Sequence, residues 1–106
     1  MTESEFQSQA DATLAAIERA IEAVDIDAEV DRSGGVLTLE FADAGKIVVN
    51  KQAPKQQIWI AARSGGFHFG WSEGTWRDTR DGRELFAALS AIVSAQIGTP
   101  VVLRPR

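Results

Sequence analysis

The chain has 106 residues, a mass of 11.5 kDa, 44% hydrophobic and 25% charged residues, and a formal net charge of -4. This is the composition of one globular domain, and we expect a single domain over residues 1–106 with a stability of roughly 5 to 10 kcal/mol. The sequence has no cysteine, which excludes disulfides, thiolate catalysis and cysteine-held zinc or iron–sulfur clusters on this chain. No apolar run approaches the roughly 18 residues of a membrane-spanning helix, so we expect a soluble protein.

The net charge conceals a strong asymmetry along the chain. Residues 1–31 hold nine carboxylates and one base, a net charge of -8, whereas the other 75 residues hold ten bases and six acids, a net charge of +4. Such asymmetry indicates recognition of charged partners, but not of nucleic acid, because the acidic segment would repel phosphates. Residues 1–11 carry three acids and no base, the reverse of a signal or transit sequence, and we expect a cytoplasmic location.

Apolar residues at spacings of three and four predict a helix from about residue 4 to residue 24. Its buried stripe comprises Phe6, Ala10, Leu14, Ile17, Ile21 and Val24. Thr2 or Ser4 can cap the start of this helix, and Glu5 suits the positive end of the helix dipole.

From residue 26 the apolar period changes from about 3.6 to 2, which indicates strands. Ser33-Gly34-Gly35 predicts a hairpin turn, and further glycine-containing turns separate the later strands. Pro54 interrupts the pattern between two of the strands. The sequence thus predicts a meander of five or six antiparallel strands, at about residues 26–31, 36–41, 46–50, 57–63, 67–71 and 75–78.

A second helix is predicted from near Asp81, because Asp81 and Glu84 have the spacing of a capping box, and it ends at Gly98 and Pro100. Both helical stripes need a surface to cover them. The economical solution is an α+β fold, a two-layer α/β sandwich in which the antiparallel sheet of five to six strands carries the N- and C-terminal helices on one face. Its other face is then open.

Carboxylates gather over the first predicted helix and strand. On the helix they recur at spacings of seven, four and three residues, away from the apolar stripe, and on the strand they share one side. We call this set the acidic ridge: Asp11, Glu18, Glu22, Asp25, Asp27, Glu29 and Asp31. Carboxylate oxygens are hard ligands, suited to iron, manganese, calcium or magnesium.

The expected spacing of these side chains, about 5 to 6 Å on a helix and roughly 6.6 Å on a strand, fits several weak, exchangeable cation sites better than one closed cage. The alternative is a solvated acidic face that binds nothing specific, as most charge runs do. A cation that binds only the folded form would raise the melting temperature.

The predicted strand after Pro54 places Gln57, Trp59 and Arg63 on the open face of the sheet by alternation. A large aromatic residue among amides and a base is a plausible contact point for a partner, and the alternative is a tryptophan packed under a loop. His68 is expected to be a surface or hydrogen-bonded residue rather than a metal ligand. The sequence has no nucleophile elbow, phosphate-binding glycine loop or histidine–carboxylate zinc motif, so we expect no catalytic residue.

Eight segments of the chain form a recognisable series: Ser4-Glu5-Phe6, Gly34-Gly35-Val36-Leu37-Thr38-Leu39, Lys46-Ile47-Val48-Val49-Asn50-Lys51-Gln52, Pro54, Gln57-Ile58-Trp59-Ile60-Ala61, Gly65-Gly66-Phe67-His68-Phe69, Trp76 and residues 82–89. In this order they resemble the frataxin family, in particular its bacterial members, over nearly the whole chain. The resemblance implies the same two-layer sandwich with both helices on one face.

The resemblance also implies a function. It makes the ridge a surface for weakly and exchangeably bound iron, ferrous or ferric, with these candidate ligands or partner contacts: Glu18, Glu22, Asp25, Asp27, Glu29 and Asp31. Asn50, Gln57 and Trp59 match the exposed sheet surface that the family uses for assembly partners, and the outward Arg63 joins them as a candidate. The implied partners are the cysteine desulfurase and the iron–sulfur scaffold protein.

On this interpretation the protein regulates iron–sulfur cluster assembly or supplies iron to it, and is not an enzyme. One alternative is a ferroxidase or iron-storage protein, although the Glu-x-x-His ligand pairs of bundle-type di-iron sites are missing. The other is an acidic protein-interaction module without a metal. We expect a monomer that contacts neither nucleic acid nor membrane, with iron-driven oligomerisation as the alternative.

Overall fold

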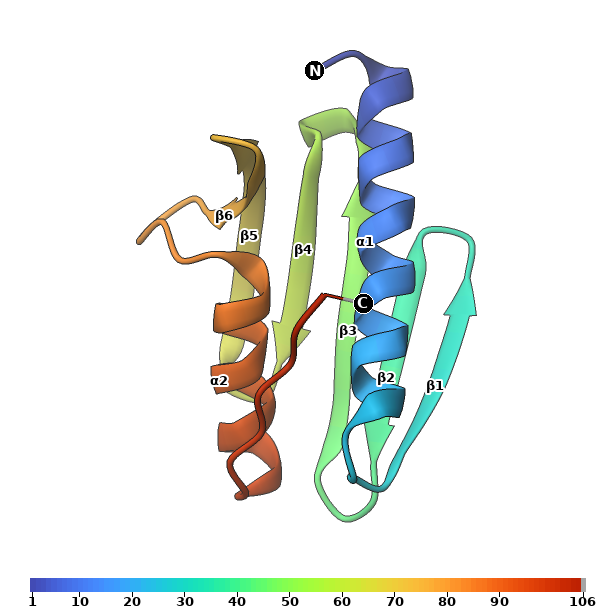
Figure 1. Ribbon diagram of the computed structural model, residues 1–106, viewed down its shortest axis with the longest axis vertical. Helices are drawn as coiled ribbons and strands as arrows, with labels where there is room; N and C mark the ends of the chain where they lie inside the picture. The colour runs from blue at the N-terminus through green and yellow to red at the C-terminus, as the bar shows by residue number, and fades with distance from the viewer. Residues whose placement is uncertain (106) are drawn as a thin grey trace.

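The computed structural model, which describes residues 1–105, is a two-layer sandwich of two helices and a six-stranded antiparallel sheet (Figure 1). The strands lie in the sheet in chain order, and both helices cover the same face. The elements are α1 (Glu3–Ala23), β1 (Ala28–Ser33), β2 (Val36–Phe41), β3 (Gly45–Gln52), η1 (Ala53–Lys55), β4 (Gln57–Ala62), β5 (Gly65–Ser72), β6 (Thr75–Asp78) and α2 (Leu85–Ile97). The predicted fold class is confirmed.

Helix α1 begins with a capping box. The Glu5 backbone N–H donates to Thr2 Oγ1 at 3.1 Å, and the Thr2 backbone N–H donates to Glu5 Oε1 at 2.8 Å. The hydrogen bonds from the backbone and side chain of Thr2 hold the pKa of Glu5 below its ordinary value. The helix thus starts one residue before the predicted boundary, with Thr2 as its cap.

Helix α2 begins at Leu85, not near Asp81, and the predicted capping box is wrong. The segment after β6 runs back along this edge of the sheet: the Asp78 backbone N–H donates to the Arg83 carbonyl at 2.8 Å, and Arg77 forms an isolated bridge with Glu84. The chain at Glu84 is therefore still extended, and its own carboxylate caps α2. Asp81 instead accepts from the Arg83 backbone N–H, which lowers the pKa of Asp81.

The core fills the space between the sheet and the helices. Alternate residues of β2, β3 and β4 point into it, and they meet the apolar stripes of α1 and α2. Trp76 on β6 is buried, and its indole Nε1–H donates to Thr13 Oγ1 of α1 at 2.9 Å. Beyond α2 the chain runs back between the two helices, where Leu103 is buried (Figure 1). Of residues 1–105, no helix is long and apolar enough to cross a membrane.

Two details of the strands differ from expectation. Strand β1 begins at Ala28 rather than at residue 26, because the Ile26 backbone N–H donates to the Val24 carbonyl in a turn. Trp71 follows the buried Phe69 in the alternation of β5, and yet it is 37% exposed. It lies at the end of the sheet beside the start of α1, and its ring meets the Trp76 ring in a T-shaped arrangement, with 5.1 Å between centroids and 77° between planes.

Candidate functional site

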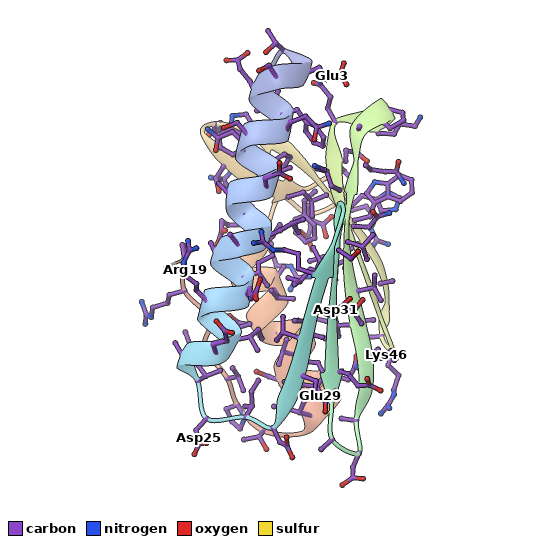
Figure 2. All side chains as sticks on the ribbon, turned by 90° about the vertical axis from the view of Figure 1, so that its right-hand side faces the viewer. Glu3, Arg19, Asp25, Glu29, Asp31 and Lys46 are labelled. Carbon is purple, nitrogen blue, oxygen red and sulfur yellow. The ribbon has the colours of Figure 1, made fainter. Side chains whose placement is uncertain are left out.

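The acidic ridge winds around the β1 edge of the molecule. Ala28 and Val30 are half-buried toward the helices, so Glu29 and Asp31, which alternate with them, face the open side of the sheet. Figure 2, which looks at this edge, shows Asp25 at the corner between α1 and β1 and the other two acids farther along β1. Arg19, the one base among residues 1–31, points away from the sheet.

Two ridge carboxylates are held by bases of the sheet. Glu18 Oε1 lies 3.2 Å from Arg32 Nε, and Asp11 Oδ1 lies 2.7 Å from Lys51 Nζ. The sequence interpretation missed both pairs. Among residues 1–105 the other ridge acids form no ion pair and are exposed: Glu22, Asp25, Asp27, Glu29 and Asp31. Five of the six candidate iron ligands therefore have no counter-ion within the part of the chain that the structure describes.

Glu40 belongs beside the ridge, although the sequence interpretation left it out. It is the cross-strand partner of Glu29, so the two like charges lie directly opposite on the open face. A shallow cleft at this corner is lined by Asp27, Glu29, Glu40 and Asp43, together with Phe41 and Ala42. The signal was available: a turn at Gly34 and Gly35 pairs Ser33 with Val36, and counting outward pairs Glu29 with Glu40.

The ridge carboxylates are spread along the edge rather than gathered at one point. Within residues 1–105, no group of three or more histidine, cysteine, aspartate or glutamate side chains is arranged to hold a metal ion. The exposed acids nevertheless create a local excess of negative charge that attracts cations or a basic protein surface. What the arrangement offers is attraction and water-rich coordination by one or two carboxylates at a time.

The open face of the sheet carries the second candidate surface. Asn50, Trp59 and His68 are successive cross-strand partners on β3, β4 and β5, so they form one row across the sheet. The Trp59 ring stacks on the His68 ring with 4.3 Å between centroids and 11° between planes. Its Nε1–H donates to Gln57 Oε1 at 2.7 Å. Trp59 is half-buried by these neighbours on its own face.

Arg63 does not join this row. Strand β4 ends at Ala62, so the alternation that predicted an outward Arg63 stops one residue early. The Arg63 guanidinium turns to the β2–β3 turn, where it donates to the Ala44 carbonyl at 2.9 Å. Gln96 of α2 bonds the same carbonyl and also the Arg63 backbone N–H. The structure thus separates Arg63 from Asn50, Gln57 and Trp59.

Comparison with known proteins agrees with this architecture. Residues 1–99 match the family model described as the frataxin-like domain. The chain is 54% identical over 105 residues to the iron-sulfur cluster assembly protein CyaY of Paraburkholderia phymatum, covering 99% of this chain and 100% of the relative. It is 58% identical over 109 residues to the protein of the same name from a Janthinobacterium species, covering 98% and 97%.

Solved structures agree as well. The frataxin of Psychromonas ingrahamii superposes with a TM-score of 0.87 at 38% identity, covering 95% of this chain and 96% of that one. Trimeric frataxin of Saccharomyces cerevisiae, complexed with ferrous iron, gives a TM-score of 0.69 at 34% identity, covering 93% and 88%. The architecture and these matches define a frataxin-like sandwich. The chain belongs to the frataxin family, which confirms the resemblance found in the sequence.

Proposed function

We propose that the protein binds iron weakly along the acidic ridge and acts in iron–sulfur cluster assembly, where it contacts the cysteine desulfurase and the scaffold protein. The names of its relatives and the ferrous complex of the yeast frataxin support this role. The observation that carries the proposal for this chain is a set of five exposed ridge acids, running from α1 around to the open face, that have no counter-ion among residues 1–105. In this proposal, iron is either a cargo that the protein supplies to cluster assembly or a signal by which the protein regulates it.

The same carboxylates serve both binding events. A basic surface of the desulfurase is attracted by the ridge, and iron bound to the ridge lowers the negative charge that this surface meets. Iron and desulfurase therefore compete, or at least weaken each other, and by linkage the effect is reciprocal. This coupling gives a way for iron to adjust the output of cluster assembly.

We propose binding and regulation rather than catalysis. The ridge offers exposed carboxylates without a histidine among them, so it favours hard-cation exchange over a fixed redox site. Oxygen consumption with ferrous iron separates the two: slow oxidation that stops near one equivalent per bound ion fits binding, and many turnovers per protein would establish a ferroxidase.

Charge reversal tests the proposed partner contact. Glu22→Lys and Asp25→Lys should each weaken binding to the cysteine desulfurase about tenfold or more at low salt, because each replaces attraction by repulsion. Glu73→Lys is the matched control: it makes the same charge change at an exposed turn between β5 and β6, and should bind almost as the wild type does. Equal loss in all three variants would reduce the effect to net charge, and retained affinity in the ridge variants would refute the contact.

Anaerobic titration calorimetry with ferrous iron tests the metal half of the proposal. The wild type should take up iron weakly, and the ridge variants should take up less. Absence of any heat or binding in the wild type, with desulfurase binding intact, would favour an acidic interaction module without a metal.

A further inference from the structure

Trp59 is held at two points by its own sheet. One face of the indole ring lies on the His68 imidazole, nearly parallel at 4.3 Å, and the ring nitrogen donates to Gln57. A tryptophan side chain without such neighbours samples several rotamers, and ordering it on binding costs free energy. In this protein the stack and the hydrogen bond restrict the ring before any partner arrives.

This arrangement determines which part of the Trp59 side chain a partner can contact. Its N–H group is engaged within the molecule, so a partner meets an apolar ring surface that needs no hydrogen-bond acceptor. The groups around the ring are the amides of Asn50 and Gln57 and the His68 imidazole, with no carboxylate on either cross-strand partner. A rigid aromatic residue in such a setting has the properties of a binding hot spot.

No role other than the contact with Trp59 is evident for the His68 side chain. It is exposed, it packs into no core, and within residues 1–105 it belongs to no group of side chains that could hold a metal ion. Its backbone carbonyl accepts from the Thr79 backbone N–H, which fixes this part of β5 against the segment after β6. The imidazole is left to contact Trp59, its cross-strand partner.

We propose that His68 is a positioning residue: through the stack of the two rings it holds the Trp59 ring in the orientation that the scaffold protein binds. This inference rests on the proposed function: the ridge attracts a basic surface of the desulfurase, and we assign the open sheet face around Trp59, which carries amides and an imidazole, to the other proposed partner, the scaffold protein. His68 itself need not touch the scaffold.

The test compares four variants. His68→Ala removes the stack, His68→Phe keeps a flat ring in the same place, and Trp59→Ala removes the contact itself. Ser72→Ala is the matched control, an exposed position on the same strand and the same face as His68 but away from Trp59. Each variant is checked for folding by circular dichroism and by its melting temperature.

Two readouts are needed. The first is the Nε1–H NMR signal of Trp59, identified among the three tryptophan indoles by its loss in Trp59→Ala. His68→Ala should shift this signal and speed its exchange with water, while His68→Phe and Ser72→Ala should keep it slow to exchange. The second readout is affinity for the scaffold protein, which His68→Ala should weaken about two- to tenfold, the range of an aromatic pair, and which His68→Phe should restore.

The outcomes distinguish the positioning role of His68 from the proposed scaffold-binding face. If Trp59→Ala weakens scaffold binding while His68→Ala leaves the affinity and the indole signal unchanged, the sheet face stands and the positioning role of His68 is overturned. If His68→Phe binds as weakly as His68→Ala, a direct imidazole contact replaces the positioning role. If Trp59→Ala binds the scaffold as tightly as the wild type does, the proposed binding face fails and the inference fails with it.

Discussion

Removing Arg32 should make the protein less stable without cations and more responsive to them. The Arg32 Nε–Glu18 Oε1 pair, 3.2 Å long, places a positive group of the protein beside a ridge carboxylate that we propose as a cation ligand. Arg32→Gln deletes that group and leaves Glu18 beside the rest of the ridge. The freed carboxylate then repels its acidic neighbours until a cation binds.

The size of the effect follows from the exposure of the pair. With 40% of the arginine and 30% of the glutamate side chain exposed, the ion pair lies in the range of about 0.2 to 1 kcal/mol. For a domain of this length that is a fall in melting temperature of roughly 1 to 8 °C in the presence of a chelator. If the freed site binds a divalent cation about threefold more tightly, a saturating cation stabilises the variant by about 0.6 kcal/mol more than it stabilises the wild type. The melting temperature of the variant then rises by roughly 3 to 5 °C more.

Thermal unfolding followed by circular dichroism measures both quantities, with chelator or with manganese at constant ionic strength and then with ferrous iron under anaerobic conditions. Arg83→Gln is the matched control, because it makes the same charge change and breaks a similarly exposed pair, Arg83 with Asp81 at 3.0 Å, outside the ridge. That variant should lose stability without gaining sensitivity to cations. An equal rise with cation in Arg32→Gln, Arg83→Gln and the wild type would refute the reasoning.

Two further predictions concern stability. Leu14→Ala, at a fully buried position of α1, should cost about 2 to 5 kcal/mol in urea unfolding, whereas Ser8→Ala on the exposed side of the same helix should change stability by about 0.5 kcal/mol or less. A loss below about 1 kcal/mol at Leu14 would contradict the core described above. The capping box predicts a pH dependence: because folding lowers the pKa of Glu5, its ionised form stabilises the helix above the ordinary value of 4.5, and this stabilisation is lost as the pH falls below that value. The wild type should therefore exceed Glu5→Gln in stability near neutral pH, and the difference should shrink in acid; a difference independent of pH would disprove the linkage.

The architecture could be predicted from sequence because its signals are local. The apolar stripe from Phe6 to Ile21 has the helical period, and the strands alternate between turns that contain glycine. The tight hairpin turn at Gly34 would also have allowed the β1–β2 register to be counted from the sequence, although the interpretation did not do so and left Glu40 out. The start of α2 failed because its capping signal was ambiguous: Asp81 and Glu84 both accept backbone N–H groups, but in two separate turns.

The candidate site was only partly predictable, because its decisive contacts join residues far apart in the chain. Glu18 and Arg32 meet only because α1 packs over the sheet next to β1, and the pattern of charges says nothing about that distance. The stack of Trp59 on His68 depends on the β4–β5 register. The alternation of β4 predicted that Arg63 faces outward with Trp59. The strand ends at Ala62, however, and the Arg63 guanidinium donates to the Ala44 carbonyl.

Anaerobic NMR titration of the protein with ferrous iron tests the central claim most directly. We predict that the backbone amides of Glu22, Asp25 and residues 27–31 broaden or shift first, that Glu40 follows, and that the amides around Trp59 and Arg83 respond little. Early and selective changes on the open face around Trp59, or no selective change along the ridge at all, would contradict the account.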